Sequence, residues 1–121
     1  TAGASGFRRW VVLRQGDGVR VAGAGGEGAS VTVRRAGDSV GATRAGVAGG
    51  RRALGSQAGV MRAFNCGGRL LEARSLGVRD AFEAATCPLP CVGFTTYGEQ
   101  YGPMQVNHTL TGLMLGVPDG R

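Results

Sequence analysis

The sequence predicts an α+β fold in which a mostly antiparallel or mixed β-sheet is packed by one good helix and one broken helix. The first reason is that short apolar segments recur along both halves of the chain, several with strict alternation of apolar and polar residues. The second is that residues 75–86 place apolar side chains at helical spacing. The third is that Pro88 and Pro90 end this helix and lead into another apolar segment.

The N-terminal third predicts an antiparallel meander of three strands. Residues 7–14 form the first strand, with Trp10 and Val12 facing inward and Leu13 as a further inward candidate. An Asp-Gly turn follows, which accepts the positive φ angles of a type I′ hairpin, and residues 19–23 form the returning strand. Residues 30–35 alternate again and complete the meander.

Residues 38–56 predict a broken helix. Asp38 or Ser39 can cap its N-terminus, because short polar side chains accept hydrogen bonds from the first backbone N–H groups. Each glycine in a helix interior costs about 1 kcal/mol relative to alanine. This segment contains Gly41, Gly46, Gly49 and Gly50.

The second half predicts a strand, a helix and two further strands. Residues 58–66 form a strand with Val60, Met61 and Phe64 as buried candidates, and the Gly-Gly-Arg sequence that follows breaks it. The helix begins at Ser75.

Residues 91–116 are the most distinctive part of the chain. Residues 91–96 predict a buried strand, residues 98–107 an ordered loop, and residues 108–116 a second strand with Leu110, Leu113 and Leu115 in the core. An ordinary connection does not need so many glycine, acid and amide groups together. The loop is therefore expected to shape a polar pocket with Gly98, Glu99, Gly102, Asn107 and His108.

Two charged side chains are candidates for this pocket. A buried Glu99 needs a partner, because an unpaired buried charge is costly. Arg69 is a candidate partner, and it could equally hold a ligand carboxylate through two parallel hydrogen bonds. His108 could ligate a haem or a metal. A single histidine at a strand start more often bonds a backbone carbonyl or titrates at the surface.

The basic charge of the chain has a compositional explanation. All 14 charged basic residues are arginine, and 24 residues are glycine. Codon bias in a very GC-rich genome produces this composition. The net charge of +6 lies in residues 1–60, where the arginines occur singly or in pairs with few aromatic residues. This pattern argues against nucleic-acid binding and for a solvated basic face.

The sequence also predicts a cytoplasmic chain. No stretch is apolar and long enough to span a membrane, and no signal peptide is evident. The start at Thr1 rather than Met favours a single domain that is a fragment or a processed chain. These 121 residues correspond to one domain or a piece of one.

The three cysteines are expected to be reduced thiols. Cys87 and Cys91 are separated by three residues, two of them proline, so the pair is not a redox CxxC motif. With one histidine and no second cysteine pair, a zinc site is not expected. No signature of a cysteine or serine nucleophile is present. We therefore expect no enzymatic activity and no obligatory cofactor.

The second half resembles the FIST C domain, the C-terminal part of the FIST sensory module. Three segments carry the resemblance: AFNCGGR at 63–69, PLPCVGFTTYGEQYG at 88–102 and VNHTLTGLMLG at 106–116. They occur in the order and spacing of that family, and the resemblance is best over 58–116. Over 7–56 it rests only on the order of the strands. Asn65 stands where the family more usually has a small hydroxyl residue.

The resemblance implies a bacterial signal-transduction domain that senses a small molecule such as an amino acid. It also implies an N-terminal FIST half and a signalling output domain or protein as partners. Carried over position by position, the residues that line or shape the ligand site would be Cys66, Arg69, Gly93, Tyr97, Gly98, Glu99, Asn107 and Thr109.

Three functional hypotheses follow. The leading one is a non-enzymatic sensor, in which a small polar ligand engages Arg69 and the 97–99 loop and shifts a conformational equilibrium. The second is a haem-binding gas sensor with His108 as the axial ligand. The third is a protein-recruitment module without a small ligand, whose mark would be an exposed apolar patch.

Overall fold

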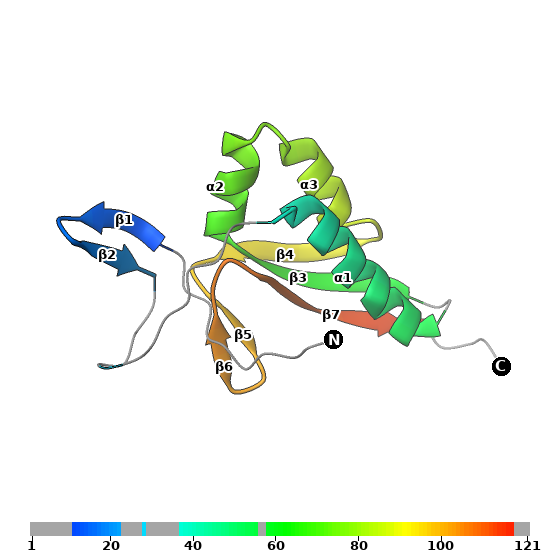
Figure 1. The fold of residues 1–121 in the computed structure, drawn as a ribbon. Coiled ribbons are helices and arrows are strands. Elements are labelled where there is room, and N and C mark those ends of the chain that lie inside the picture. The colour runs from blue at the N-terminus through cyan, green and yellow to red at the C-terminus, as the bar shows by residue number, and fades with distance from the viewer. Residues whose placement is uncertain (1–10, 23–27, 29–36, 56–57, 118–121) are drawn as a thin grey trace.

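The computed structural model describes residues 11–22, 28, 37–55 and 58–117. Within these residues the fold is α+β, as predicted, with three helices and seven strands (Figure 1). In chain order they are β1 (Val11–Gln15), β2 (Gly18–Val21), α1 (Ser39–Ala53), β3 (Ala58–Cys66), α2 (Gly67–Ser75), α3 (Arg79–Thr86), β4 (Cys91–Thr96), β5 (Glu99–Tyr101), β6 (Met104–Val106) and β7 (Leu110–Gly116).

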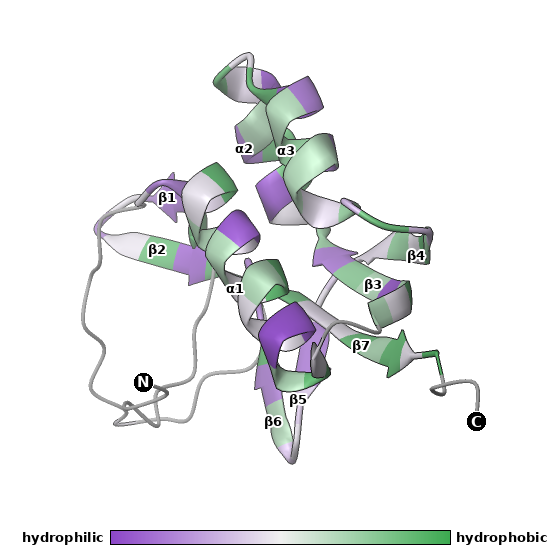
Figure 2. Cartoon of the chain, turned by 90° about the vertical axis from the view of Figure 1, so that its right-hand side faces the viewer, coloured by the Kyte–Doolittle hydropathy of each residue, from purple (hydrophilic) through white to green (hydrophobic). Residues whose placement is uncertain are grey.

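A mixed three-stranded sheet organises the domain. Its order is β4-β3-β7, in which β3 runs parallel to β4 and antiparallel to β7. Helices α1, α2 and α3 lie on one side of this sheet (Figures 1 and 2). β1 with β2 and β5 with β6 form two separate antiparallel hairpins.

The core lies between α1 and the sheet. Because side chains alternate along a strand, Met61 and Ala63 of β3 face the helices and pack with Val47 of α1. Around this centre, four partly buried apolar side chains close the cluster: Leu89, Cys91, Leu110 and Met114. Phe82 and Ala85 of α3 are also buried.

Helix α1 is continuous, so the predicted break is wrong. Asp38 caps it as expected, since its Oδ1 accepts a hydrogen bond from the Gly41 N–H group at 2.8 Å. At Gly50, an added Cβ would lie 3.0 Å from Met114 Sδ. The helix therefore tolerates this glycine because it allows close packing on β7, and the packing outweighs the low helix propensity.

The helical region after β3 also differs from the prediction. The Gly-Gly-Arg sequence ends β3 as predicted, but it also begins α2, a helix that was not predicted, and the helix predicted from Ser75 begins only at Arg79. The reason is Gly77, whose φ of +68° ends α2 in a left-handed residue. The Gly77 N–H group donates to the Arg74 carbonyl and the Val78 N–H group to the Ala73 carbonyl.

The strand predictions are largely confirmed. β3 and β4 have the predicted bounds, and the 19–23 strand is observed as β2, Gly18–Val21. The prediction that residues 91–96 are buried is wrong, because the side chains of β4 are mostly exposed. The predicted 98–107 loop contains the β5–β6 hairpin, which turns at Gly102 with a φ of +58°. Residues 7–10, including Trp10, and the predicted strand at 30–35 lie outside the described residues.

Four predicted core positions are exposed instead. Val12 and Leu13 of β1 are 47% and 42% exposed, and Leu113 and Leu115 of β7 are 58% and 53% exposed. Val60 and Phe64 of β3, predicted as buried, are only half-buried. The two leucines lie on the side of the sheet that the helices do not cover, because Met114 between them takes the core position. Leu110 does pack against the core.

The expected thiol state is wrong for two of the three cysteines. Cys87 and Cys91 form a disulfide with their Cα atoms 5.5 Å apart, which joins the end of α3 to the start of β4. The two prolines between them shape the turn that brings the cysteines together, a tertiary outcome that the spacing alone does not predict. Cys66 is a buried free thiol.

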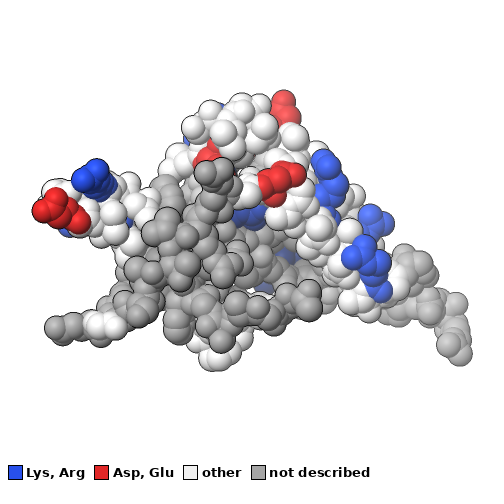
Figure 3. All heavy atoms as spheres, in the orientation of Figure 1, with Lys and Arg blue, Asp and Glu red and all other residues white. Residues whose placement is uncertain are grey.

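The described arginines of the first half are exposed, as the basic-face interpretation predicts: Arg14, Arg20, Arg44, Arg51 and Arg52. Basic side chains gather over α1, which ends with Arg51 and Arg52 (Figure 3). No helix in the described part of the chain has the length and apolar character of a membrane span.

Candidate functional site

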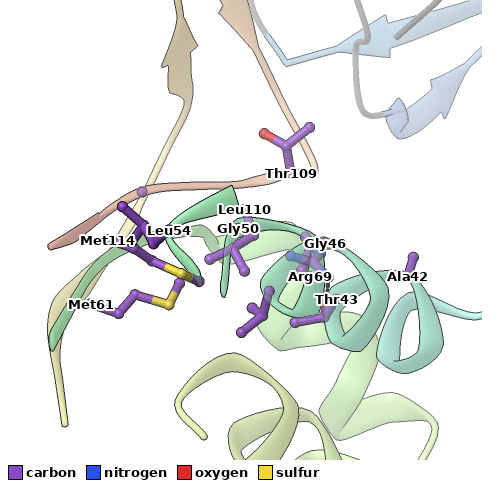
Figure 4. Close-up of a pocket in the computed structure, with 12 residues that line it drawn as sticks. Ala42, Thr43, Gly46, Gly50, Leu54, Met61, Arg69, Thr109, Leu110 and Met114 are labelled. Carbon is purple, nitrogen blue, oxygen red and sulfur yellow. Dashed lines mark hydrogen bonds between the residues drawn. The ribbon is translucent and has the colours of Figure 1, made fainter. Parts of the chain in front are cut away.

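A cavity of about 540 Å³ opens between α1 and the helix-facing side of the sheet (Figure 4). Its polar end is formed by Arg69 of α2 and Thr43 of α1. Its apolar end is formed by Leu54, Met61 and Met114. The remaining lining residues are Ala42, Gly46, Val47, Gly50, Thr109, Leu110 and Gly112.

Two glycines of α1 contribute to the space in this cavity. Gly46 and Gly50 both line it, and nothing lies within 4 Å of the position that a Gly46 Cβ would occupy. Larger side chains at these positions would project from the helix toward the sheet and fill the cavity. The glycine-rich sequence that predicted a broken helix is therefore part of the cavity wall.

Arg69 is held at the polar end by three hydrogen bonds. Its Nη1 donates to Asn65 Oδ1 at 3.2 Å, and its Nη2 donates both to the Ser39 carbonyl at 3.2 Å and to Thr43 Oγ1. The guanidinium carbon lies 4.9 Å from the centroid of the Phe82 ring, in the range of a cation–π contact. The side chain of Arg69 is therefore held by groups of α1, α3 and β3.

Arg69 is a buried cation with only 5% of its surface exposed. Burial lowers the pKa of Arg69, and the charges of Glu72 and Glu99 offset part of that effect. Among the described residues, no carboxylate forms an ion pair with it. A guanidinium has five N–H donors, and the three hydrogen bonds above leave two of them for another acceptor.

Glu99 is buried, but its partners are not those predicted. Thr96 Oγ1 donates to Glu99 Oε1, while the Thr109 N–H and hydroxyl groups donate to Glu99 Oε2 at 3.3 and 2.6 Å. The expected Glu99–Arg69 pair is therefore wrong. Hydroxyl and amide donors satisfy this carboxylate, which joins the end of β4 to the start of β7.

Gly98 and Asn107 flank the β5–β6 hairpin, Gly98 at its start and Asn107 at its end. Asn107 is 1% exposed, and its Nδ2 donates to the Tyr97 carbonyl at 3.0 Å. A Cβ at Gly98 would lie 3.1 Å from Asn107 Nδ2 and 3.1 Å from Gln105 Nε2, so the close approach favours glycine there. Asn107 therefore ties down the loop through a side chain–backbone hydrogen bond.

His108 is not among the residues that line the cavity. Its Nε2 lies 3.0 Å from Glu72 Oε2 of α2, and its backbone φ is +57°. This contact connects α2 to the segment that leads into β7. Within the described residues, no group of three or more histidine, cysteine, aspartate or glutamate side chains is arranged to hold a metal ion.

The structure divides the predicted site. Arg69 and Thr109 line the cavity. Glu99 lies behind Thr109, whereas Gly98 and Asn107 stabilise the hairpin. Cys66 is buried at the β3–α2 junction, where its N–H group donates to the Thr109 carbonyl at 3.0 Å.

Two of the positions that the family resemblance assigned to the ligand site do not line the cavity. The Tyr97 side chain is fully exposed. At Gly93, an added Cβ would lie 1.8 Å from the Ala63 carbonyl oxygen, so glycine there serves the close approach of β4 to β3.

The cavity residues that the sequence interpretation missed come mainly from α1 and the core strands. They are Thr43, Gly46, Gly50, Met61 and Met114. A signal was present in the four glycines inside the helix, Gly41, Gly46, Gly49 and Gly50. Glycines at helical spacing on a continuous helix indicate a face that either packs closely or leaves space.

Comparison with known proteins gave no match: no family model, no curated protein and no solved structure matches the chain.

Proposed function

We propose that this chain is a non-enzymatic ligand-sensing domain, of the FIST C kind, that binds a small carboxylate with an apolar body, such as an apolar amino acid. The observation that carries this proposal is Arg69, a buried cation at the cavity wall with no carboxylate partner among the described residues. A ligand carboxylate would supply the missing anionic partner through charge-assisted hydrogen bonds.

The shape and polarity of the cavity support this ligand class. Its volume of about 540 Å³ lies within the range of roughly 300–1,000 Å³ that is typical of small-molecule sites. Arg69 and Thr43 offer polar contacts at one end, while Met61 and Met114 offer flexible apolar contacts at the other. The ligand would be more apolar than the small polar molecule that the loop residues alone predict.

Ligand binding would signal through the position of α1. This helix contributes Thr43 at the polar end and Leu54 at the apolar end, so a ligand that contacts both would hold α1 against β7. The bound state would then be favoured over states in which α1 packs less closely. A signalling protein or output domain that contacts α1 would detect the difference.

The haem alternative receives less support from the geometry. His108 bonds Glu72 and is absent from the cavity lining, so it would have to leave this partner to reach an iron in the cavity. The carboxylate proposal needs no such rearrangement, because Arg69 already lines the cavity.

The proposal is tested by thermal-shift and calorimetric titration of the purified chain with leucine, methionine and the corresponding amines that lack the carboxylate. We expect the carboxylates to raise the melting temperature in a dose-dependent way and the amines to leave it unchanged. A ligand at a hundred times its Kd stabilises the native state by about 2.7 kcal/mol.

Two pairs of variants make the test specific. Arg69→Lys should weaken binding about tenfold or more, because lysine lacks the planar donor fork, while Arg74→Lys on the exposed part of the same helix should not change binding. Gly46→Leu should fill the cavity and abolish binding, while Gly49→Leu, outside the lining, should leave it intact. Equal binding by Arg69→Lys and the unaltered chain, or no shift with any carboxylate, would contradict the proposal.

A further inference from the structure

One face of the central sheet is apolar, and none of the described helices lies on it. The side chains on it are those that alternate with the core residues: Val60, Arg62 and Phe64 of β3, Val92 and Phe94 of β4, and Leu113 and Leu115 of β7. We call this set the open sheet face. Val92 and Phe94 of β4 are 62% and 63% exposed, and these exposed fractions are similar to those of Leu113 and Leu115 on β7.

These side chains form a continuous surface across all three strands. Arg62 pairs with Val92 on one side and Leu113 on the other, and Phe64 pairs with Phe94. The rings of Phe64 and Phe94 contact edge to face, with centroids 5.2 Å apart. A large exposed apolar patch of this kind marks an interaction site rather than ordinary protein surface.

A single charge lies at the centre of the open sheet face. Arg62 is exposed, and its guanidinium carbon lies 5.9 Å from the centroid of the Phe64 ring. Within the described residues, no carboxylate forms an ion pair with Arg62. Burial of this face against a purely apolar surface would leave the cation without a partner, which is costly.

The positive charge of Arg62 restricts which surfaces can pack on the open sheet face. A second copy packed face to face about a two-fold axis would bring its own Arg62 toward this one, and like charges repel. The sequence outside the described residues contains five arginines, against Glu27 and Asp119 as its only acids. The net charge of +3 on these segments disfavours them as the occupant beside the Arg62 cation, and a separate partner with a carboxylate within an apolar surface fits better.

We propose that the open sheet face is a docking surface for a separate protein unit whose apolar surface carries one aspartate or glutamate opposite Arg62. The apolar contacts supply the binding energy, and the Arg62–carboxylate pair fixes the orientation and excludes basic partners. This surface lies on the side of the sheet opposite the cavity, so it is independent of the ligand proposal.

The test uses two synthetic amphipathic helical peptides with leucine-rich faces, identical except for one central residue, glutamate in one and lysine in the other. Binding to the full chain is measured by fluorescence anisotropy. We expect the glutamate peptide to bind about tenfold or more tightly than the lysine peptide. Arg62→Glu should reverse this preference, and Phe94→Ser should weaken both interactions while the far-UV spectrum stays native.

Four outcomes would overturn the proposal. They are failure of both peptides to bind, equal binding of both, and two that assign the face to another occupant. A dimer in sedimentation experiments that Phe94→Ser dissociates would assign it to a second copy. Tighter binding to phosphatidylserine vesicles than to either peptide, lost in Phe94→Ser, would assign it to a membrane surface.

Discussion

Single residues with similar burial have different roles in this domain. Arg69 and Glu99 are both almost fully buried and oppositely charged, yet they do not pair. Glu99 is satisfied by the Thr96 and Thr109 hydroxyl groups and an amide. Arg69 instead lines the cavity with two N–H donors left for another acceptor. Glu99 therefore has a structural role, whereas Arg69 is the candidate binding residue.

This difference predicts the effect of neutralising Glu99. Glu99→Gln should lower the free energy of unfolding by about 1–3 kcal/mol, because an amide nitrogen replaces an oxygen that accepts hydrogen bonds in a buried site. The measurement is urea denaturation. Glu83→Gln, which removes only the exposed Arg79–Glu83 pair, is the control and should cost less than about 1 kcal/mol. Equal stability of the two variants would refute the structural role of Glu99.

At the scale of elements, α1 combines a capped N-terminus with an interior rich in glycine. Its glycines are not equivalent, because Gly50 packs against Met114, Gly46 faces the cavity, and a Cβ at Gly49 would meet only Arg52 Nη2 at an ordinary contact distance of 3.8 Å. The low intrinsic propensity of this helix is offset by tertiary contacts with β7 and α3. The helix is thus held by its packing, which is consistent with the proposed ligand response.

This account predicts three different outcomes for three glycines of the same helix. Gly46→Ala and Gly49→Ala should each raise the free energy of unfolding by up to about 1 kcal/mol, since alanine has the higher helix propensity and no steric conflict at either site. Gly50→Ala should gain less or destabilise the domain, because its Cβ would lie 3.0 Å from Met114 Sδ. Thermal and urea unfolding of the three variants would check this, and a uniform gain would contradict the close packing on β7.

At the scale of the whole molecule, the helices cover one side of the sheet and a disulfide joins α3 to β4. The covered side contains the small core and the cavity, and the other side is the open sheet face. The Cys87–Cys91 bond closes a short loop, so its effect on the unfolded state is modest, about 2 kcal/mol. Cys66 forms no disulfide and is buried by the tertiary fold.

Thiol alkylation followed by mass spectrometry tests this organisation. The native chain without reductant should take up no label, because Cys66 is buried and the other two cysteines are bonded. Unfolding in urea should expose one thiol, and unfolding with reductant should expose three. Two labels on the native chain would show that Cys87 and Cys91 are free thiols, and one label would show that Cys66 is accessible.

The sequence predicted those features that depend on local patterns. The bounds of β3 and β4, the first hairpin, the Asp38 cap and the α+β class follow from alternation, turn chemistry and capping, which act over a few residues. Arg69, which the sequence analysis named as a candidate ligand contact, lines the cavity.

Other features were decided only when distant segments came together. The continuity of α1, the separation of Glu99 from Arg69 and the exposure of Leu113 depend on which groups face one another across the sheet. The Cys87–Cys91 bond likewise depends on how the turn is folded. Local patterns do not specify these contacts, because packing and hydrogen-bond satisfaction are properties of the assembled structure. The sequence thus determined the elements, and the tertiary structure decided which of their side chains form the cavity and which form the open sheet face.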